Sequence, residues 1–597
     1  MRSPLGKTIR QLWWLPLVCF GLAWVGSQTE FVRELEWHSL DWRTKFRLSF
    51  QKPPDPRLAI VLFEDATEAL LEKPWPVDRQ YHTQMTQVLA LAGAKMVVWD
   101  IILDAKREGD GDTNMGQIAE AANEAGVKVL SAAVTNREPT GATPGKEGPT
   151  KPLPHVEGDI RKLDGDEHAF IPFPQLRKTS LYGFADTPPS SDGIRRAVPL
   201  MIRVGQEVYP HLALQVVLTH FGVKVEDVRV RLGEAVSFPA EGRTIRIPID
   251  PAGKLLLNYR YDQIGHATDL PVFSYGSLLY NLSEVFLEEK KPKRPPPDLK
   301  GRIVLLGQTV TGKADAGPSQ LRDHTPLTFV VANAVNNMLA EDYGRRAPNW
   351  MVWTLVGLLG YGWILFVADL SVLNLCLGAV LIVVGYISVA LWSWVGGSWW
   401  VPLVPPLGGF GLLQFITVAR RVWQEQKAKQ EIKGMFGSYV SPEIVDRMIK
   451  SDQPPQLGGH EEEITAYFSD IQGYSTFSEK LPPEQLVKLL NEYLTVCTDT
   501  VQAEGGTLDK YIGDAVVAIF GAPITLPDHA YRACLAAVLC QERLGELRAT
   551  WNAAGDVWPE GVRKMRSRVG LNSGPAIIGN MGSRTRFSYT MTGDNVN

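Results

Sequence analysis

The sequence contains few cysteines, and none of them forms a pattern typical of a metal site. The five are Cys19, Cys376, Cys497, Cys534 and Cys540. None lies between residues 27 and 348, so disulfide bonds cannot stabilise that stretch, and it needs a hydrophobic core of its own. No CxxC pair or Cys/His arrangement is present, which removes sequence support for zinc binding.

The chain also lacks a surplus of charge of either sign. It carries 61 Lys and Arg against 65 Asp and Glu, a formal net charge of −4. Because a protein that binds nucleic acid needs a basic surface to neutralise phosphates, we expect no nucleic-acid partner. The length of 597 residues is too great for one hydrophobic core and predicts at least two domains.

Long apolar runs are present, and they divide the chain. We predict four transmembrane helices, at residues 11–27, 349–368, 372–394 and 399–419. A helix that crosses a bilayer needs ~20 apolar residues, so the first run is short. A cleaved signal peptide is the alternative for it, but the bulky Trp24 and Val25 near the possible cleavage point favour an uncleaved anchor.

Basic residues predict which side of the membrane each part occupies. Residues 1–10 are basic, and the residues after the last run include Arg420, Arg421, Lys427 and Lys429. Since positive charge favours the cytoplasmic side, we expect 28–348 outside the cell (inner or plasma) membrane and 420–597 in the cytoplasm. Arg345 and Arg346 lie on the wrong side for this rule. The predicted protein is multi-pass and embedded in the lipid bilayer.

The outer region has the pattern of an α/β domain. The predicted strands are 58–63, 95–103, 127–132, 244–249, 255–259 and 302–307. A helix is predicted at 81–92, and residues 136–158, rich in Pro, Gly and Thr, are predicted to be a surface loop. Alternation of strands and helices favours a parallel or mixed sheet.

Segments of this region resemble the second class of CHASE domains, extracellular sensors found on bacterial cyclases, histidine kinases and related proteins. They are DWRTKFR at 41–47, PWPVDR at 74–79, LALAGAKMVVWDIIL at 89–103, IDPAGKLLLNYR at 249–260, LKGRIVLLGQTVTGKADA at 299–316 and TPLTFVVANAVNNML at 325–339. The resemblance implies an extracytoplasmic sensor over 28–348 with an unknown ligand.

Residues 420–459 are predicted to be a signalling helix and linker. A polar helix over 418–436 continues the last apolar run, with a rough apolar stripe on one side. The stripe fits a dimerising helix that transmits a signal, and a solvated exit helix is the alternative. Ser441 and Pro442 suit the N-cap and first position of a further helix.

Two carboxylates lie at the ends of predicted strands in the last region, 460–597. The strand 464–469 ends at Asp470, and a tight turn at Gly513-Asp514 joins predicted strands 507–512 and 515–520. If these strands are neighbours, the two carboxylates can hold divalent cations for in-line attack at phosphorus. A solvated cap and a purely structural hairpin are the alternatives.

Four motifs of this region resemble those of class III adenylyl and guanylyl cyclases in order and spacing. They are FSDIQGYSTFSE at 468–479, GGTLDKYIGDAVVAIFGAP at 505–523, VGLNSGPAIIGNMGS at 569–583 and YTMTGDNVN at 589–597. The resemblance implies a ferredoxin-like βαββαβ domain that works as a homodimer and converts ATP to 3′,5′-cyclic AMP and pyrophosphate.

The resemblance also assigns metal-binding and catalytic residues. Asp470, Asp514 and the backbone carbonyl of Ile471 would hold two divalent metal ions, Mg²⁺ or Mn²⁺, in each active site. Asn597 would position the ribose in the transition state. The chain ends within this last motif, and the family pattern places a catalytic arginine one helical turn further on, followed by a helix and closing strands. We therefore expect the cyclase domain here to be C-terminally incomplete.

Substrate-binding residues follow from the same motifs. Gly473, Tyr474 and Ser475 would form the turn that cradles the triphosphate, with Tyr474 in place of the more usual Phe. Lys510 would donate to adenine N1, and Thr590 would accept from the adenine amino group. A guanylate cyclase is the nearest alternative, and Lys510 argues against it. A catalytically silent receptor that uses the fold for dimerisation is another; a histidine kinase or diguanylate cyclase finds no matching pattern in 420–597.

Overall fold

The computed structural model describes residues 12–50, 54–104, 110–140, 142–260, 271–290, 295–313, 315–367, 370–436, 459–582 and 587–597. The chain forms two compact units, Met1–Thr417 and Val418–Asn597, and each is described by itself. The predicted helix start at Ser441 and Pro442 lies outside the described residues.

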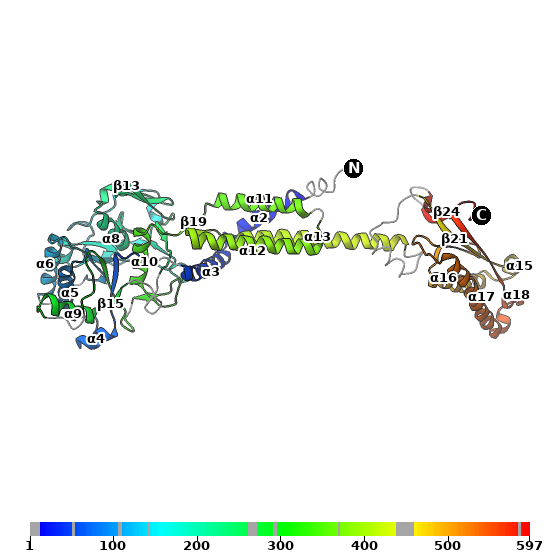
Figure 1. Ribbon diagram of the computed structural model, residues 1–597, viewed down its shortest axis with the longest axis horizontal. Coiled ribbons are helices and arrows are strands. Elements are labelled where there is room, and N and C mark those ends of the chain that lie inside the picture. The colour runs from blue at the N-terminus through cyan, green and yellow to red at the C-terminus, as the bar shows by residue number, and fades with distance from the viewer. Residues whose placement is uncertain are drawn as a thin grey trace. The chain divides into compact units, whose positions relative to one another are not determined.

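A mostly parallel β-sheet forms the centre of the α/β head in the first unit (Figure 1). Its strands run in the order β15-β1-β16-β2-β3-β6, and β7 also pairs with β3. The bounds are β1 Leu58–Phe63, β2 Met96–Ile102, β3 Lys128–Asn136, β6 His168–Phe170, β7 Leu181–Phe184, β15 Val272–Ser274 and β16 Ile303–Gln308. The predicted parallel or mixed sheet is present, and only β6 pairs antiparallel within it among the described strands.

Helices cover both faces of this sheet. Helices α5 (Arg79–Leu91), α6 (Gly111–Glu124) and α9 (Tyr275–Phe286) share one hydrophobic core with one face, and α8 (Leu212–Phe221) and α10 (Leu327–Leu339) share another with the opposite face. The short helices are α4 (Asp65–Leu71) and α7 (Pro174–Thr179), and Leu176 of α7 belongs to the core that α5, α6 and α9 share. Burial on both faces explains why β1 is apolar at every position.

Small β-sheets complete the head; of their strands, β13 matches the predicted strand 244–249 and β14 overlaps the predicted strand 255–259, while the others were not predicted. The additional strands are β4 His155–Glu157, β5 Gly165–Asp166, β8 Ala197–Pro199, β9 Met201–Val204, β10 Glu207–Pro210, β11 Arg229–Arg231, β12 Ala235–Ala240, β13 Arg243–Pro248, β14 Lys254–Leu256, β17 Ala316–Gly317 and β18 Thr325–Pro326. Strand β4 lies within the predicted loop 136–158, where Thr150 is also buried, so that prediction was wrong in part.

The predicted strand 255–259 is too long. Strand β14 ends at Leu256, because side chains of α10 take over the backbone hydrogen bonds that follow. The N–H of Asn258 donates to Asn337 Oδ1, and the N–H of Arg260 donates to Asn333 Oδ1, both at 2.8 Å. Buried amides thus replace a neighbouring strand here.

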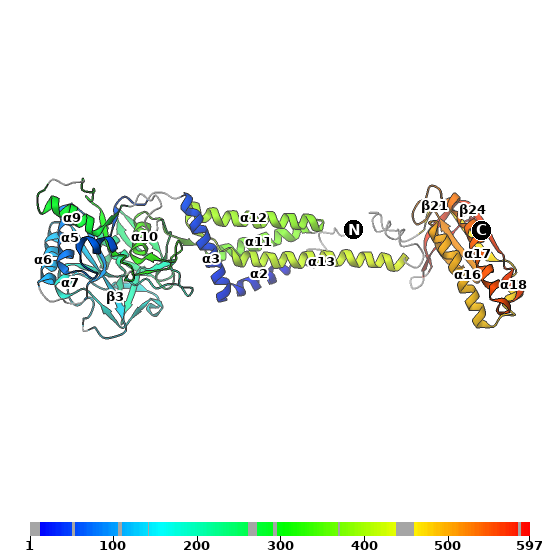
Figure 2. The same cartoon turned by 90° about the horizontal axis from the view of Figure 1, so that it is seen from below.

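Helices make up most of the described remainder of the first unit, and the last of them continues into the second unit. They are α2 Leu15–Gly26, α3 Glu30–Arg47, α11 Asn349–Val367, α12 Val372–Gly397 and α13 Val404–Phe436. Helices α2, α11, α12 and α13 lie alongside one another (Figures 1 and 2). Within the described ranges, α12 alone is long and apolar enough to cross a membrane by itself; a second span results if α2 and the following helix, bent by 87°, count as one. Crossing by all four predicted helices stays a prediction.

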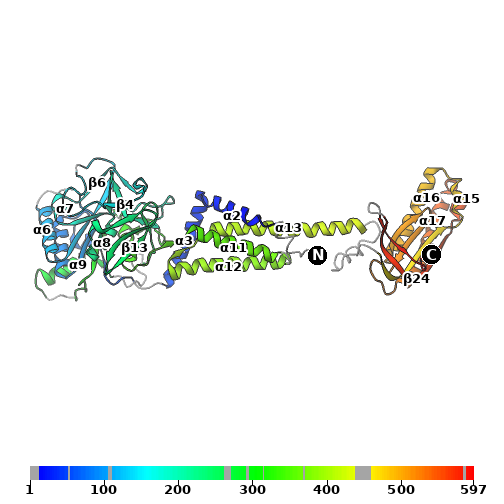
Figure 3. The ribbon, with the colours of Figure 1, turned by 90° about the horizontal axis from the view of Figure 1, so that it is seen from above.

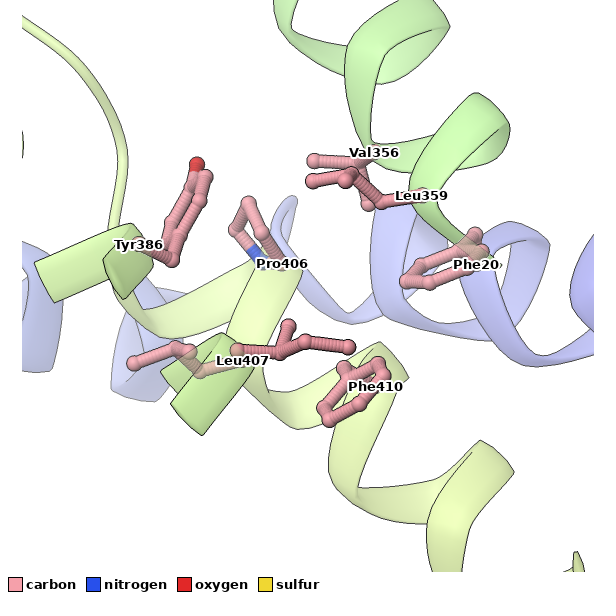
Figure 4. A pocket seen from close by; sticks show the side chains of 8 residues that line it. Phe20, Val356, Leu359, Tyr386, Pro406, Leu407 and Phe410 are labelled. Carbon is pink, nitrogen blue, oxygen red and sulfur yellow. The ribbon is translucent and has the colours of Figure 1, made fainter. Parts of the chain in front are cut away.

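The helices α2, α11, α12 and α13 meet around a small apolar pocket (Figure 4). The lining residues are Phe20, Val356, Leu359, Ile382, Tyr386, Pro406, Leu407 and Phe410. Each of the four helices contributes to the lining, so they pack as one bundle.

The last predicted apolar helix, 399–419, begins later than expected. Trp399–Trp400 form strand β20, which pairs in parallel with β19 (Arg345–Arg346). Because these residues are held extended by that pairing, α13 starts only at Val404. It then continues without a break to Phe436, which confirms the predicted polar continuation of the apolar helix.

The buried carboxylate of Glu36 on α3 caps the start of α13. It accepts hydrogen bonds from the backbone N–H groups of Leu403 at 2.7 Å and Val404 at 2.8 Å, and from the Trp400 indole at 2.9 Å. The buried guanidinium of Arg43 pairs with it at 2.9 Å. The first N–H groups of a helix have no partner within that helix, so another helix supplies one here.

Helix α3 is also tied to the head. Asp41 forms a two-point ion pair with Arg196, with Nε to Oδ1 at 2.8 Å and the second nitrogen to Oδ2 at 2.6 Å. Gln320 donates to the same carboxylate at 3.1 Å. Helix α3 therefore connects the α/β head to the beginning of α13.

The second unit is a five-stranded antiparallel sheet in the order β22-β23-β21-β24-β25. Its elements are β21 His460–Ile471, α15 Tyr474–Ser478, α16 Pro483–Ala503, β22 Thr507–Ile512, β23 Ala515–Phe520, α17 His529–Ala553, α18 Glu560–Arg563, β24 Ser567–Gly582 and β25 Phe587–Thr592. The long helices α16 and α17 lie side by side on one face (Figure 3). The predicted βαββαβ order is present, followed by β25.

We expect Glu36→Ala to destabilise the first unit strongly. The change leaves the Arg43 charge buried without its carboxylate and two helix N–H groups without an acceptor, a loss of about 3 kcal/mol. Thermal unfolding of the purified chain measures the effect, with Glu34→Ala on the same helix as the matched control. Equal unfolding temperatures for the two variants would contradict a stabilising role for the Glu36 carboxylate at the start of α13.

Candidate active site

Antiparallel pairing brings the two predicted carboxylates together. Ser469 on β21 lies opposite Val516 on β23, so Asp514, just before β23, lies opposite Ile471. The N–H of Ile471 donates to Asp514 Oδ2 at 2.8 Å. Asp470 is the neighbouring residue; the sequence predicted that the strand ends there, and β21 continues one residue further, to Ile471.

An arginine that the sequence analysis missed lies against Asp470. Arg568 on β24 is the register partner of Asp470, and its Nε donates to Oδ1 at 2.8 Å while a terminal nitrogen donates to Oδ2 at 2.5 Å. Asp470 raises the pKa of the Arg568 guanidinium, and Asp514 adds to the shift. Arg568 directly precedes the third motif, but only the pairing of β21 with β24 reveals its partner.

The donor atoms at this place fit hard divalent cations. Asp470 and Asp514 provide carboxylate oxygens, and the adjoining backbone of Ile471 provides a carbonyl, which are the ligand types that Mg²⁺ prefers. Across the described ranges, no group of three or more His, Cys, Asp or Glu side chains could hold a metal ion. Arg568 occupies one position on each Asp470 oxygen, so the guanidinium competes with a cation for that carboxylate.

The turn after β21 has the form that the motif required. Gly473 has φ of 70°, a left-handed conformation that favours glycine, and it directly precedes α15. Tyr474 is half-buried; burial raises the pKa of its phenol, and the negative charge of Asp514 raises it further. Ser475 is exposed, and α15 begins at Tyr474. The turn therefore lies beside the two carboxylates.

Lys510 and Thr590 form a second cluster. Strands β22 and β25 stand at opposite ends of the strand order, yet Lys510 Nζ donates to Thr590 Oγ1 at 2.9 Å. The structure thus brings together the pair that the motifs assigned to the purine. Their role in binding a nucleotide stays a prediction.

A third member of this cluster, Asp509, was missed from the sequence. The Thr590 hydroxyl donates to Asp509 Oδ2 at 2.6 Å, and Lys510 Nζ lies 3.4 Å from Oδ1. The Asp509 side chain is 1% exposed. Burial raises the pKa of its carboxyl group, while its contacts with Thr590 and Lys510 oppose the shift.

An irregularity in β22 explains how neighbours in sequence share one cluster. Side chains of adjacent residues in a regular strand point to opposite faces. The register of β22 shifts between Leu508 and Lys510, so Asp509 occupies a bulge. Such a bulge re-aims side chains, and here both Asp509 and Lys510 reach Thr590.

Asn597 lies exposed after β25. Within the described part of the chain, no hydrogen bond joins Asn597 to either cluster, and none joins Asp470 or Asp514 to Lys510 or Thr590. Strand β24 reaches both clusters, with Arg568 opposite Asp470 near one end and Gly579 opposite Thr590 near the other. One chain therefore presents two separate groups of candidate residues.

We expect Arg568→Gln to strengthen binding of Mn²⁺ in the absence of nucleotide by a few fold. The guanidinium and the cation compete for the same Asp470 oxygens, and the effect is small because the ion pair is exposed. Electron paramagnetic resonance of free Mn²⁺ measures the affinity, with Arg566→Gln as the control. Weaker binding in Arg568→Gln would show that the arginine supports the cation.

Comparison with known proteins covers both units. Residues 15–373 match the sequence model of the CHASE2 domain, and residues 459–597 match that of the adenylate and guanylate cyclase catalytic domain. Adenylate cyclase 1 of Rhizobium meliloti (strain 1021) is 35% identical over 162 residues, which are 27% of this chain and 24% of that protein. An uncharacterized protein of Mycobacterium tuberculosis (strain ATCC 25618 / H37Rv) is 32% identical over 171 residues, 29% of each chain.

The crystal structure of the adenylyl cyclase CyaB from P. aeruginosa is 35% identical and covers 24% of this chain and 70% of its own, with a TM-score of 0.22. The chain spans about a quarter of the length of the curated relatives it matches.

Proposed function

Since this chain belongs to the CHASE2 family and carries a class III adenylate and guanylate cyclase catalytic domain, we propose that it is a membrane-bound sensor that makes 3′,5′-cyclic AMP from ATP. The hydrogen bond from Lys510 to Thr590 is the observation that carries the choice of ATP. The relative named adenylate cyclase 1 agrees with it.

The chemistry of this pair suits adenine. A lysine ammonium has only donors, and a threonine oxygen can accept. Adenine presents an acceptor at N1 and an amino donor at N6, whereas guanine presents a donor at N1 and an acceptor at O6. Lys510 would therefore meet an acceptor on adenine but a second donor on guanine, and a mismatched polar contact away from water is costly.

Asp470, Asp514 and the Ile471 carbonyl would hold two divalent ions, Mg²⁺ or Mn²⁺. Bound there, such ions lower the pKa of a coordinated hydroxyl and neutralise phosphate charge. The ribose 3′-hydroxyl would lose its proton to solvent and its oxygen would bond to the α-phosphorus, while the bond from that phosphorus to the α–β bridging oxygen breaks and pyrophosphate leaves.

The chain's other candidate residues would bind and orient the nucleotide. The turn of Gly473, Tyr474 and Ser475 lies beside the two carboxylates and would hold the triphosphate. Asn597 would orient the ribose. Arg568, which contacts the Asp470 carboxylate, would lie close to the reacting phosphates.

A homodimer would unite the two clusters. Because no described interaction joins Asp470 and Asp514 to Lys510 and Thr590 within one chain, we propose that each active site takes its metal-binding residues from one protomer and its purine-binding residues from the other. Two equivalent sites result.

We propose that the four apolar helices cross the cell membrane, with residues 28–348 outside and 420–597 inside. In that arrangement, the unbroken course of α13 from Val404 to Phe436 would carry a change in the head to the cytoplasmic side. The head would bind an extracytoplasmic ligand whose identity is open. Two alternatives, a guanylate cyclase and a silent receptor, fit less well, because Lys510 and both carboxylates are in place.

We expect Asp470→Ala and Asp514→Ala each to lower cyclic AMP formation by ~100-fold or more, because loss of a metal ligand removes several kcal/mol of transition-state stabilisation. Cyclic AMP output with Mg²⁺ and with Mn²⁺ measures the effect. Asp528→Ala, which removes a surface partner of Arg532, is the control. Near-wild-type turnover of either variant at saturating Mn²⁺ would refute the assignment.

Parallel assays with ATP and GTP test the choice of purine. We expect ATP to be preferred. We also expect Lys510→Glu to lower kcat/KM for ATP by about 5- to 150-fold, because the hydrogen bond from Lys510 to adenine N1 is lost. Unfolding temperature should change little, because the Lys510 side chain is 45% exposed. Equal turnover of ATP and GTP by the unaltered protein would overturn the proposed function.

A further inference from the structure

We propose that Asp509 is a positioning residue that determines which purine the Lys510–Thr590 pair accepts, by fixing the hydroxyl proton of Thr590. The inference rests on the proposed function and deepens it. It concerns a side chain that would not itself touch the nucleotide.

The hydrogen bonds of Thr590 carry the argument. A hydroxyl group has one proton and two lone pairs, so it can donate once and accept twice. The Thr590 proton is directed to Asp509 Oδ2 at 2.6 Å, and one lone pair accepts from Lys510 Nζ at 2.9 Å. Only an acceptor site remains on the oxygen for a ligand.

The Asp509 carboxylate is well suited to hold that proton. An ionised carboxylate only accepts hydrogen bonds, and the Asp509 side chain is 1% exposed, so little water competes for it. Its other oxygen lies 3.4 Å from the Lys510 ammonium, an ion-pair distance that favours the ionised carboxylate. The bulge in β22 lets this buried carboxylate reach Thr590 beside Lys510, whose own side chain is 45% exposed.

This arrangement fixes which hydrogen-bond donor and which acceptor the Lys510–Thr590 pair presents to a purine. Lys510 offers a donor and Thr590 an acceptor, which match N1 and the amino group of adenine. A threonine with a free proton could rotate and donate to the O6 acceptor of guanine, and the site would then tolerate part of the wrong purine. Asp509 removes that option.

Asp509→Asn is the matching substitution. Lys510 has only donors, so the asparagine oxygen should face Lys510 and its NH₂ group should face Thr590. That NH₂ group donates to the threonine oxygen and releases the threonine proton. We expect the ratio of kcat/KM for ATP to that for GTP to fall about tenfold, mainly through KM.

A second substitution separates this role from general support of the fold. Thr590→Val has no hydroxyl proton to fix, so Asp509→Asn should not change the ATP-to-GTP ratio in that background. The double-mutant cycle therefore gives a coupling that a purely structural Asp509 would not produce. Glu492→Gln, which alters a carboxylate bound to the Trp551 indole in the same domain, is the control and should leave the ratio unchanged.

The unaltered protein offers a test that does not depend on folding of a variant. Purine riboside triphosphate lacks the 6-amino group, and 6-methoxypurine riboside triphosphate carries an acceptor there while N1 stays an acceptor. With an acceptor-only Thr590, KM should rise from ATP to the purine analogue and rise again for the methoxy analogue. A methoxy analogue that binds as well as the purine analogue would overturn the inference.

The outcomes distinguish the inference from the proposed function. An ATP preference that Asp509→Asn reduces only when Thr590 is present supports both. An ATP preference that Asp509→Asn leaves unchanged, or equal losses of ATP and GTP turnover, overturns the role of Asp509 and leaves the function standing. No preference in the unaltered protein refutes the proposed function and, with it, the inference.

Discussion

The contact between the Glu36 carboxylate and the first N–H groups of α13 is the constraint on which the first unit depends. Glu36 and its partner Arg43 are both buried, so separating them is costly. The same helix holds the head through Asp41 and Arg196. A rearrangement of the head that moves α3 must therefore also move the start of α13, the helix that continues beyond the first unit.

Sequence patterns predicted the central elements of both units and missed the connecting ones, for a physical reason. Strand β1 is buried on both faces and reads as an uninterrupted apolar run, so its bounds were correct. Helix α3 was not predicted, because the residues it buries include Glu36, Asp41, Arg43 and Arg47. Hydrophobic periodicity cannot detect a helix whose buried face is held by ion pairs.

In the candidate site, too, the sequence predicted some residues and missed others. Motifs gave Asp470, Asp514, Lys510 and Thr590, and the structure places them in two clusters. Arg568 and Asp509 were missed, since the first depends on which strands pair and the second on a bulge. Neither feature follows from spacing along a single sequence.

Strand β24 serves both clusters, with Arg568 near one end and Gly579, opposite Thr590, near the other. In the proposed homodimer, each chain gives its metal-binding cluster to one active site and its purine-binding cluster to the other. A substitution in one cluster would therefore inactivate only one of the two sites. In a mixed dimer of one chain altered at Asp470 and one altered at Lys510, both substitutions would lie in the same active site. The other active site would contain only unaltered residues. Two inactive alleles of such a protein would complement each other when expressed in the same cell.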